Sequence, residues 1–241
     1  QCDLFDDVKK VKSSCDKSTC CSIDLPIYIL DRVNPAGRQV EGTALRAGYR
    51  SFIGIEGLVH RHGLTIGEVA YYLYNELNAK FPLHIISYKA NECNKELMPW
   101  SIPPSPNYPG LFTSAFYSGQ CLWEGTNLSE GRGTTLPFEL VGAPFINPKN
   151  LEEKLNALNL PGVYFRRHYF TPTFSKFKDE LCGGVQVHVL DRKAFLPVHT
   201  GWAMLDVIRN MYPNDFKVNA PYKVGANCML QFNTGCNYIM E

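Results

Sequence analysis

Residues 25–31 read LPIYILD, and this short apolar run is the first of the segments that set the fold. The run ends in the polar Asp31, so it predicts a buried strand that leads into a functional loop. Further on, residues 65–68 (TIGE) have the spacing of a capping box, and apolar side chains then recur at helical intervals. Residues 83–88 are a second strand candidate. A helix placed between strands is typical of an α/β protein.

The rest of the chain continues this alternation. Asn150 and Glu153 are spaced to cap a helix, and the apolar residues before Pro213 predict another. Between them, the valines of residues 185–189 alternate with polar residues, as in a half-buried strand. Residues 98–109 contain five prolines, which fix an extended path and predict a rigid crossing between two lobes. We therefore expect an α/β protein with domains at residues 1–95 and 96–241.

Composition limits the possible partners. The chain has 241 residues, of which 45% are hydrophobic and 20% charged, as in an ordinary globular protein. A formal net charge of +1 gives no reason to expect a nucleic acid or an anionic membrane as partner. No apolar run approaches the roughly 18 residues that span a bilayer. The start of the chain does not have the order of a signal peptide, so we expect any export signal to have been removed.

Nine cysteines are unevenly placed along the chain. Their clustering at the two termini predicts disulfides that staple the ends, and hence a secreted, periplasmic or other oxidising location. Inert buried thiols in a reducing compartment are the alternative. Because nine is odd, at least one thiol is free or bonded to another chain. No pair has CxxC metal spacing, and His60 and His62 lack an acidic partner, so no metal site and no cofactor are predicted.

The loop at residues 121–139, CLWEGTNLSEGRGTTLPFE, holds the candidate chemistry. Its glycines suit backbone that bends tightly or approaches a ligand, although a solvated surface turn is the alternative. Glycoside hydrolysis needs one protonated and one ionised carboxyl group. Glu124 follows Trp123, an aromatic of the kind that packs on sugar faces, whereas Glu130 lies near Arg132, which would keep a carboxylate ionised. The pattern favours a glycosidase site over a loop tied by its own ion pairs.

Long segments of the chain resemble the NamZ-like exo-β-N-acetylmuramidases, which are peptidoglycan-recycling glycoside hydrolases. The resemblance extends almost continuously from about Leu25 to Phe216. It is carried by LDRVNPAG (30–37), VEG (40–42), RHGLTIGE (61–68), PPSPNYP (103–109), CLWEGTNLSEGRGTTLPFELVGAPF (121–145) and YFTPTFSKFKDELCGGVQVHV (169–189).

The resemblance implies a partial Rossmann-like lobe and a smaller α/β C-terminal lobe with a cleft between them. It also implies release of N-acetylmuramic acid from the non-reducing ends of cell-wall fragments. Glu124 and Glu130 would be the catalytic carboxylates, and Arg132 would lie near the lactyl carboxylate of the sugar. The other expected substrate-binding residues are polar members of the shared motifs: Asp31, Asn34, Arg61, His62, Asn107 and Asn127.

One departure from the family leaves three explanations open. The family has a much longer segment before residues 30–37, including a Pro-Glu-His-Gly motif expected to carry a catalytic acid, and it continues further at the other end. The chain would then be one piece of a processed enzyme, with a second polypeptide, bound through a disulfide or non-covalently, supplying the missing sheet strands. Otherwise it would be a secreted sugar-binding protein without catalysis, or a structural or assembly subunit. Asn127 also begins a formal glycosylation sequon, and a glycan there would favour the structural alternative.

Overall fold

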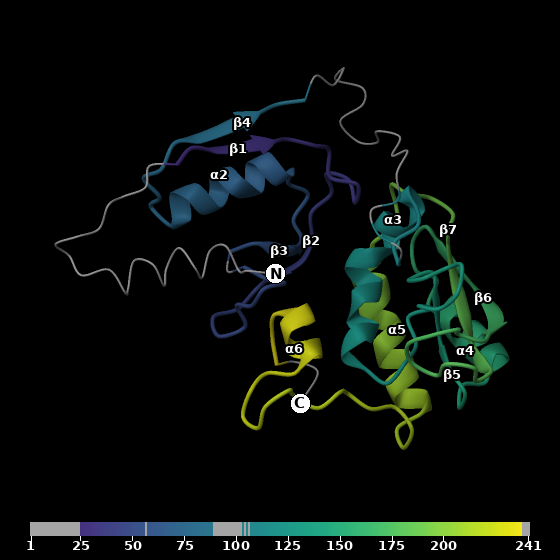
Figure 1. The fold of residues 1–241 in the computed structure, drawn as a ribbon. Coiled ribbons are helices and arrows are strands. Elements are labelled where there is room, and N and C mark those ends of the chain that lie inside the picture. Colours follow the sequence, from purple (N-terminus) through teal and green to yellow (C-terminus); the bar gives the residue numbers. More distant parts are fainter. Residues whose placement is uncertain (1–24, 56, 89–102, 104, 106, 238–241) are drawn as a thin grey trace. The chain divides into compact units, whose positions relative to one another are not determined.

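The computed structural model describes residues 25–55, 57–88, 103, 105 and 107–237. The chain divides into two compact units (Figure 1). The first unit consists of residues 1–33 and 64–91, and the second consists of residues 34–63 and 92–241. The predicted boundary at residues 95 and 96 and the N-terminal cysteines lie outside the described residues, as does most of the proline run. The division at that boundary therefore stays a prediction.

The first unit is a β-α-β arrangement. Strands β1 (Ile27–Leu30) and β4 (Leu83–Ile86) pair in parallel, and helix α2 (Ile66–Glu76) lies between them in sequence. The capping box predicted at residues 65–68 is present, because the Thr65 hydroxyl accepts from the Glu68 backbone and the Glu68 carboxylate accepts from the Thr65 backbone. The α/β fold class is confirmed. One β-α-β repeat is common to many α/β folds, so the Rossmann-like description stays a prediction.

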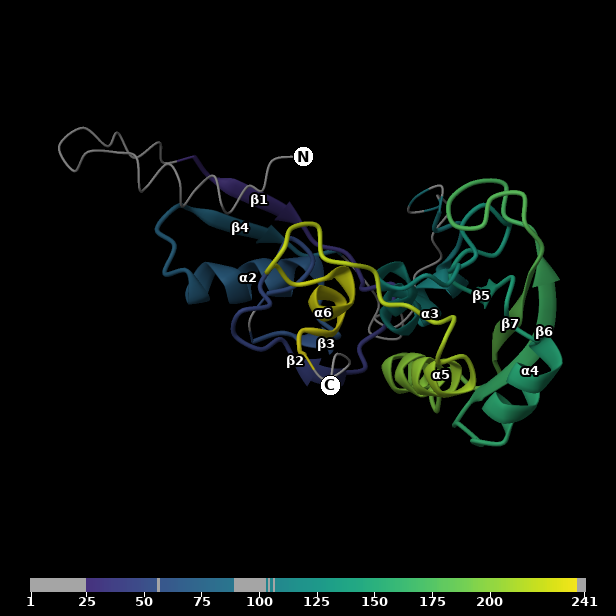
Figure 2. The same cartoon turned by 90° about the horizontal axis from the view of Figure 1, so that it is seen from below.

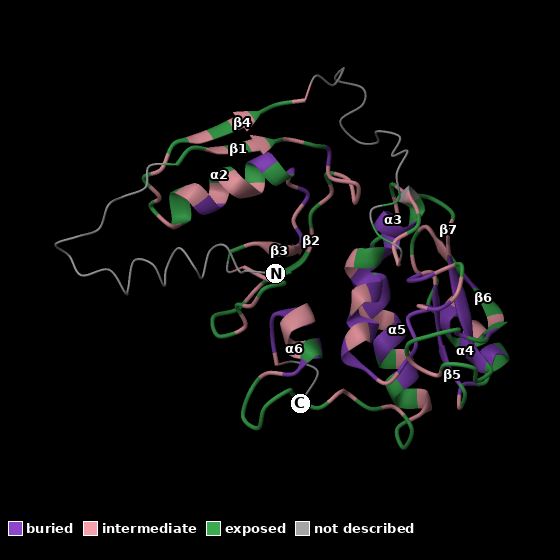
Figure 3. Cartoon of the chain, viewed as in Figure 1, coloured by how far each residue is buried: buried purple, intermediate pink, exposed green. Residues whose placement is uncertain are grey.

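The two faces of this small sheet differ in burial. Helix α2 packs close to one face, where a Cβ added to Gly67 would lie 2.8 Å from the Ile85 side chain. The opposite face carries exposed apolar side chains: Tyr28 is 60%, Leu30 66% and Ile86 50% exposed. Figure 3 shows β1 and β4 without buried residues. Within the described residues, the unit therefore has one covered and one uncovered sheet face.

The second unit is larger and contains two antiparallel sheets. The first sheet pairs β2 (Glu41–Ala44) with β3 (Val59–Arg61), and the second has the order β5-β7-β6. The strands of the second sheet are β5 (Leu140–Ala143), β6 (Val163–Phe170) and β7 (Cys182–Val189). The helices are α3 (Leu111–Gln120), the 3₁₀ helix η2 (Cys121–Gly125), α4 (Pro148–Asn156), α5 (Pro197–Met211) and α6 (Met229–Thr234).

The core of this unit joins the helices to one face of the three-stranded sheet. Phe116 of α3, Met204 and Ile208 of α5 and Val185 and Val187 of β7 belong to a single buried cluster. Helices α3 and α5 run side by side in Figure 1 and Figure 2. This core holds the end of α3 in place, and the candidate site follows directly from that end.

One sequence-based expectation is corrected and another is not confirmed. The N-cap of α4 is Asn147, whose side chain accepts from the Asn150 backbone, because Pro148 already begins the helix. Cys121, Cys182, Cys228 and Cys236 are free thiols, so no disulfide is seen among the described residues, and stapling of the two ends stays a prediction. At the C-terminal end, Cys228 and Leu230 pack in the core.

The crossing of α3 and α5 depends on two glycines. A Cβ at Gly119 would lie 1.8 Å from the Pro197 carbonyl oxygen, and one at Gly201 would lie 2.4 Å from the Gly119 oxygen. We expect Gly119→Ala to lower the free energy of unfolding by at least about 2 kcal/mol, because the helices must separate. Gly110→Ala, which meets nothing within 4 Å, is the control for a urea-unfolding comparison. Equal stability of the two variants would contradict this account of the crossing.

Candidate active site

The loop at residues 121–139 is built on the end of α3 and on strand β5. Its first residues form η2, and Gly125 packs so closely on α6 that an added Cβ would lie 2.5 Å from the Leu230 nitrogen. Ser129 then pairs with Gly142 of β5. Gly131 and Gly133 adopt φ angles of 78° and 85°, a region that side chains disfavour. The glycines predicted to permit tight turns therefore shape a fixed loop.

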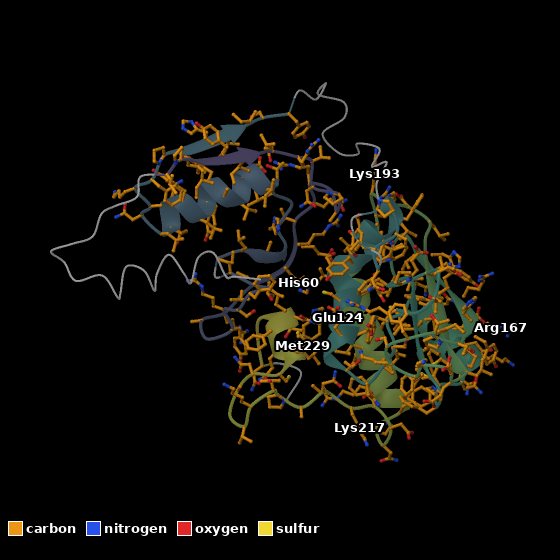
Figure 4. The ribbon with its side chains drawn as sticks, in the orientation of Figure 1. His60, Glu124, Arg167, Lys193, Lys217 and Met229 are labelled. Carbon is orange, nitrogen blue, oxygen red and sulfur yellow. The ribbon has the colours of Figure 1, made fainter. Side chains whose placement is uncertain are left out.

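This loop brings Glu124, Glu130 and Arg132 together. The Arg132 guanidinium donates to Glu124 through Nη2, and its Nε lies 3.1 Å from Glu130 Oε1 as an ion pair. The two carboxylates differ in exposure, since the side chain of Glu130 is 4% exposed and that of Glu124 is 26% exposed. Glu124 is labelled in Figure 4. One arginine therefore bridges a buried carboxylate and a solvent-accessible one.

Lys176 completes this ionic cluster. Its Nζ donates to Glu130 Oε2 at 2.9 Å, to the Trp123 carbonyl at 2.7 Å and to the Leu128 carbonyl at 2.8 Å. Sequence reasoning missed Lys176 as a site residue, although it lies within the family motif at residues 169–189. Three further charged residues follow it in the same motif, at positions 178–180, so no signal in the sequence singled out Lys176. Glu130 is thus held between two cations.

The electrostatic surroundings of Glu124 favour its protonated form. Burial is the largest effect and raises the pKa of the Glu124 carboxyl group above its usual range, and the charge of Glu130 acts in the same direction. Arg132 and Lys176 oppose this change. Protonation of Glu124 therefore depends on how closely Arg132 is held to it.

A row of aromatic rings extends from Arg132. The guanidinium lies 5.2 Å from the centre of the Phe138 ring, Phe138 meets Tyr117 edge to face at 4.8 Å, and Tyr117 meets Tyr108 at 5.4 Å. Burial, followed by the charge of Glu124, raises the pKa of Tyr117 to about 12. The Tyr117 hydroxyl is therefore protonated at neutral pH and available as a donor.

The thiol beside this cluster is not activated. Cys121 Sγ lies 3.7 Å from His60 Nε2, but burial, followed by the charge of Glu124, raises the thiol pKa to about 12. Burial also lowers the pKa of His60. A neutral histidine beside a protonated thiol does not provide the thiolate that a cysteine nucleophile requires. The chemistry of this site is therefore centred on the carboxylates.

Trp123 does not have the location expected from the sequence. Its side chain is fully buried, and its indole nitrogen donates to Gln120 Oε1 at 2.6 Å. The turn of η2 directs this ring into the core, so it cannot pack on a sugar. The Tyr117 ring, which is 37% exposed and interacts with Glu124, is the better candidate for that contact.

Two predicted sugar-binding residues have structural partners. The Asn127 side chain donates to the Asp215 carbonyl and accepts from the Lys217 backbone, which ties the loop to the segment after α5. Arg61 is buried and donates to Gln39 Oε1 and to the Ala36 carbonyl. These contacts fix the two side chains in place, and a role for either in substrate binding stays a prediction.

The remaining predicted residues lie away from the ionic cluster in sequence. Asp31 belongs to the first unit, where its carboxylate accepts from Gly67 and Thr65 at the start of α2. Asn34 accepts from the Ala36 backbone in a short turn. His62 follows β3 and Asn107 lies in a turn before α3, and both are half-buried. Their substrate-binding roles stay predictions.

Two further properties concern the described residues as a whole. No group of three His, Cys, Asp or Glu side chains in this part of the chain is arranged to hold a metal ion. No helix in it has both the length and the apolar character needed to cross a membrane.

Comparison with known proteins connects the site to a family. The C-terminal model of the family described as exo-beta-N-acetylmuramidase NamZ matches residues 115–241, and the N-terminal model matches residues 15–111. The peptidoglycan beta-N-acetylmuramidase NamZ of Bacillus subtilis (strain 168) is 45% identical over 197 residues, covering 80% of this chain and 48% of that protein. The chain thus spans about half the length of this curated relative.

Two solved structures share the fold. Both are DUF1343 family proteins from Bacteroides fragilis NCTC 9343, and both are 28% identical to this chain. One has a TM-score of 0.72 and matches 88% of this chain and 57% of its own length. The other has a TM-score of 0.61 and matches 91% of this chain and 58% of its own length.

The different burial of the two carboxylates predicts different costs of removal. Glu130→Ala leaves Lys176 and Arg132 without their shared buried partner, so we expect a loss of about 3 to 5 kcal/mol of unfolding free energy. Glu124→Ala removes a partly exposed group, while Arg132 keeps Glu130, so its loss should be clearly smaller. Urea unfolding of both variants measures the difference. A larger loss for Glu124→Ala would contradict the assignment of Glu130 as the buried anchor.

Proposed function

Because this chain belongs to the NamZ exo-β-N-acetylmuramidase family, as its motifs predicted, we propose that it takes part in hydrolysis of peptidoglycan fragments. The proposed reaction releases N-acetylmuramic acid from non-reducing ends. The observation that carries this proposal is the bridging of two carboxylates of unequal burial by Arg132. A carboxyl group whose surroundings favour its protonated form is suited to general-acid catalysis at a glycosidic bond, and Glu124 has such surroundings.

In this proposal Glu124 exchanges the proton and Glu130 holds the arginine. Glu124 is the accessible carboxylate, and burial already raises its pKa. A substrate carboxylate, such as the lactyl group of N-acetylmuramic acid, would compete for Arg132 and remove a charge that keeps Glu124 ionised. Substrate binding would therefore favour a protonated Glu124, which can donate to the leaving oxygen.

Tyr117 is the proposed sugar contact beside this acid. Its ring is partly exposed, and its hydroxyl stays protonated next to Glu124. An aromatic ring with a donor at its edge can pack on a sugar face and hydrogen-bond a hydroxyl group. This residue takes the role that the sequence suggested for Trp123.

We also propose that the complete enzyme includes polypeptide beyond these residues. The uncovered apolar face of β1 and β4 is one support, because parallel sheets are usually covered on both faces. The coverage of only 48% of the Bacillus subtilis relative is another. The further strands and a second catalytic group would come from the same precursor or from a second polypeptide, with an oxidising compartment as the proposed location.

The activity test compares the unaltered protein with single variants. Each is purified from its natural source or reconstituted with the further polypeptide proposed above. We expect hydrolysis of a chromogenic N-acetylmuramic acid glycoside, and a loss of about 10²- to 10⁴-fold in kcat for Glu124→Gln. The control is Glu153→Gln, which alters a 63% exposed carboxylate on α4. Near-normal turnover by Glu124→Gln would overturn its role.

The alternative function is sugar binding without catalysis. The proteins prepared for the activity test also distinguish sugar binding from hydrolysis. Saturable binding of muramic acid fragments by calorimetry, with no turnover in the reconstituted protein, would select the binding protein. Neither binding nor turnover would select the structural subunit.

A further inference from the structure

A strained loop places Lys176 against the carboxylate cluster. In the loop at residues 172–179, every second residue from Ser175 to Asp179 has a positive φ angle. The angles are 72° at Ser175, 56° at Phe177 and 63° at Asp179. Side chains rarely adopt this left-handed region, and each such residue costs on the order of 1 kcal/mol. Two of these residues flank Lys176 directly. A conformation that costs this much persists only where the surroundings hold it.

Several contacts hold the loop in this conformation. Thr173 donates to the Gly133 carbonyl from both its backbone and its hydroxyl, at 2.9 Å each. The Asp179 backbone closes the loop on the Pro172 carbonyl at 2.8 Å. Phe177 packs against both hydrophobic clusters of the second unit. The loop is therefore attached directly to the glycine that follows Arg132.

The ammonium group at the tip of this loop is fully engaged. The three protons of Lys176 match its three acceptors, which are two backbone carbonyls of the site loop and Glu130 Oε2. Glu130 Oε1 is left for Arg132 Nε, and Arg132 Nη2 is left for Glu124. These contacts form a series from Lys176 through Glu130 and Arg132 to Glu124. Lys176 lies at one end of this series of contacts, and Glu124 lies at the other.

We propose that Lys176 is a positioning residue of this site, which binds one side of the buried Glu130 and thereby reserves Arg132 for Glu124. Without Lys176, the buried Glu130 carboxylate has one cation left, and desolvation makes that attraction strong. Arg132 then moves toward Glu130 and away from Glu124. Lys176 thus sets the protonation of a carboxylate that it does not touch. Where turnover is concerned, this role rests on the proposed function.

The first experiment measures Glu124 directly and needs no activity. Infrared difference titration follows the carboxyl band that disappears in Glu124→Gln. In Lys176→Met we expect the pKa of Glu124 to move upward, because both Arg132 and Lys176 lower it in the unaltered protein. Lys176→Arg should restore much of the original value by keeping the charge. An unchanged Glu124 titration in folded Lys176→Met overturns the proposal.

The matched control lies two residues further along the same loop. Lys178 is 63% exposed and pairs only weakly, at 3.7 Å, with Asp179. Lys178→Met removes the same charge from the same loop and should leave the Glu124 titration in place. If both methionine variants shift it equally, the effect is one of net charge and the positioning role is overturned.

The activity readout separates this inference from the proposed function. In the reconstituted enzyme, Lys176→Met should lower kcat by about 10- to 100-fold with little change in KM, and should move the pH–rate profile upward. A shifted Glu124 titration in a protein without muramidase activity would overturn the proposed function and support the positioning role. A normal profile with normal kcat would overturn the positioning role alone.

If Lys176→Met fails to fold, the double variant Glu130→Gln/Lys176→Met replaces it. Removing both charges leaves no uncompensated buried ion, so this variant should fold. Compared with Glu130→Gln alone, it should raise the pKa of Glu124 by less than Lys176→Met does in the unaltered background, because only the direct charge effect of Lys176 is then lost. If the pKa of Glu124 rises in the double variant by as much as it does in Lys176→Met alone, Lys176 does not act through Glu130 and the proposal is overturned.

Discussion

The buried carboxylate of Glu130 is the constraint around which the site is arranged. A charge that is 4% exposed is tolerated only with close partners, and Arg132 and Lys176 provide them from two separate segments. The loop geometry follows from this requirement. Glycines at positions 131 and 133 allow the turn that brings Arg132 back over Glu130, and the loop around Lys176 is attached to Gly133.

This arrangement separates a fixed carboxylate from an adjustable one. Glu130 is 4% exposed, and its carboxylate contacts both Arg132 and Lys176. Glu124, by contrast, is accessible to solvent, with a side chain that is 26% exposed. Its partial burial still raises the pKa of its carboxyl group. The sequence suggested this division from neighbouring residues, with Arg132 keeping Glu130 ionised and with a loop tied by its own ion pairs as the alternative. The structure shows that one arginine serves both carboxylates, which makes their properties interdependent.

Local patterns predicted the elements well, whereas contacts between distant segments could not be predicted. The capping box at Thr65 and the strand around Val185 and Val187 depend on neighbours a few residues away. The expectation that this strand is half-buried is wrong, because Gln186 between the two valines is buried as well. Lys176 meets Glu130 across 46 residues, so only the packed fold brings them together. Trp123 was misplaced for a related reason, because the 3₁₀ turn decides which way its ring points.

The shared arginine connects protonation to ligand binding. An anionic group that draws Arg132 away from Glu124 raises the pKa of that carboxyl group, because Arg132 is the main charge that lowers it. Binding and protonation are linked reciprocally, so protonation of Glu124 must equally strengthen the binding of an anion at Arg132. If the site binds a carboxylate-bearing sugar as proposed, that affinity would therefore rise as the pH falls through the Glu124 transition. A neutral sugar would lack this dependence, so under the proposed function the site would distinguish the two kinds of ligand by charge.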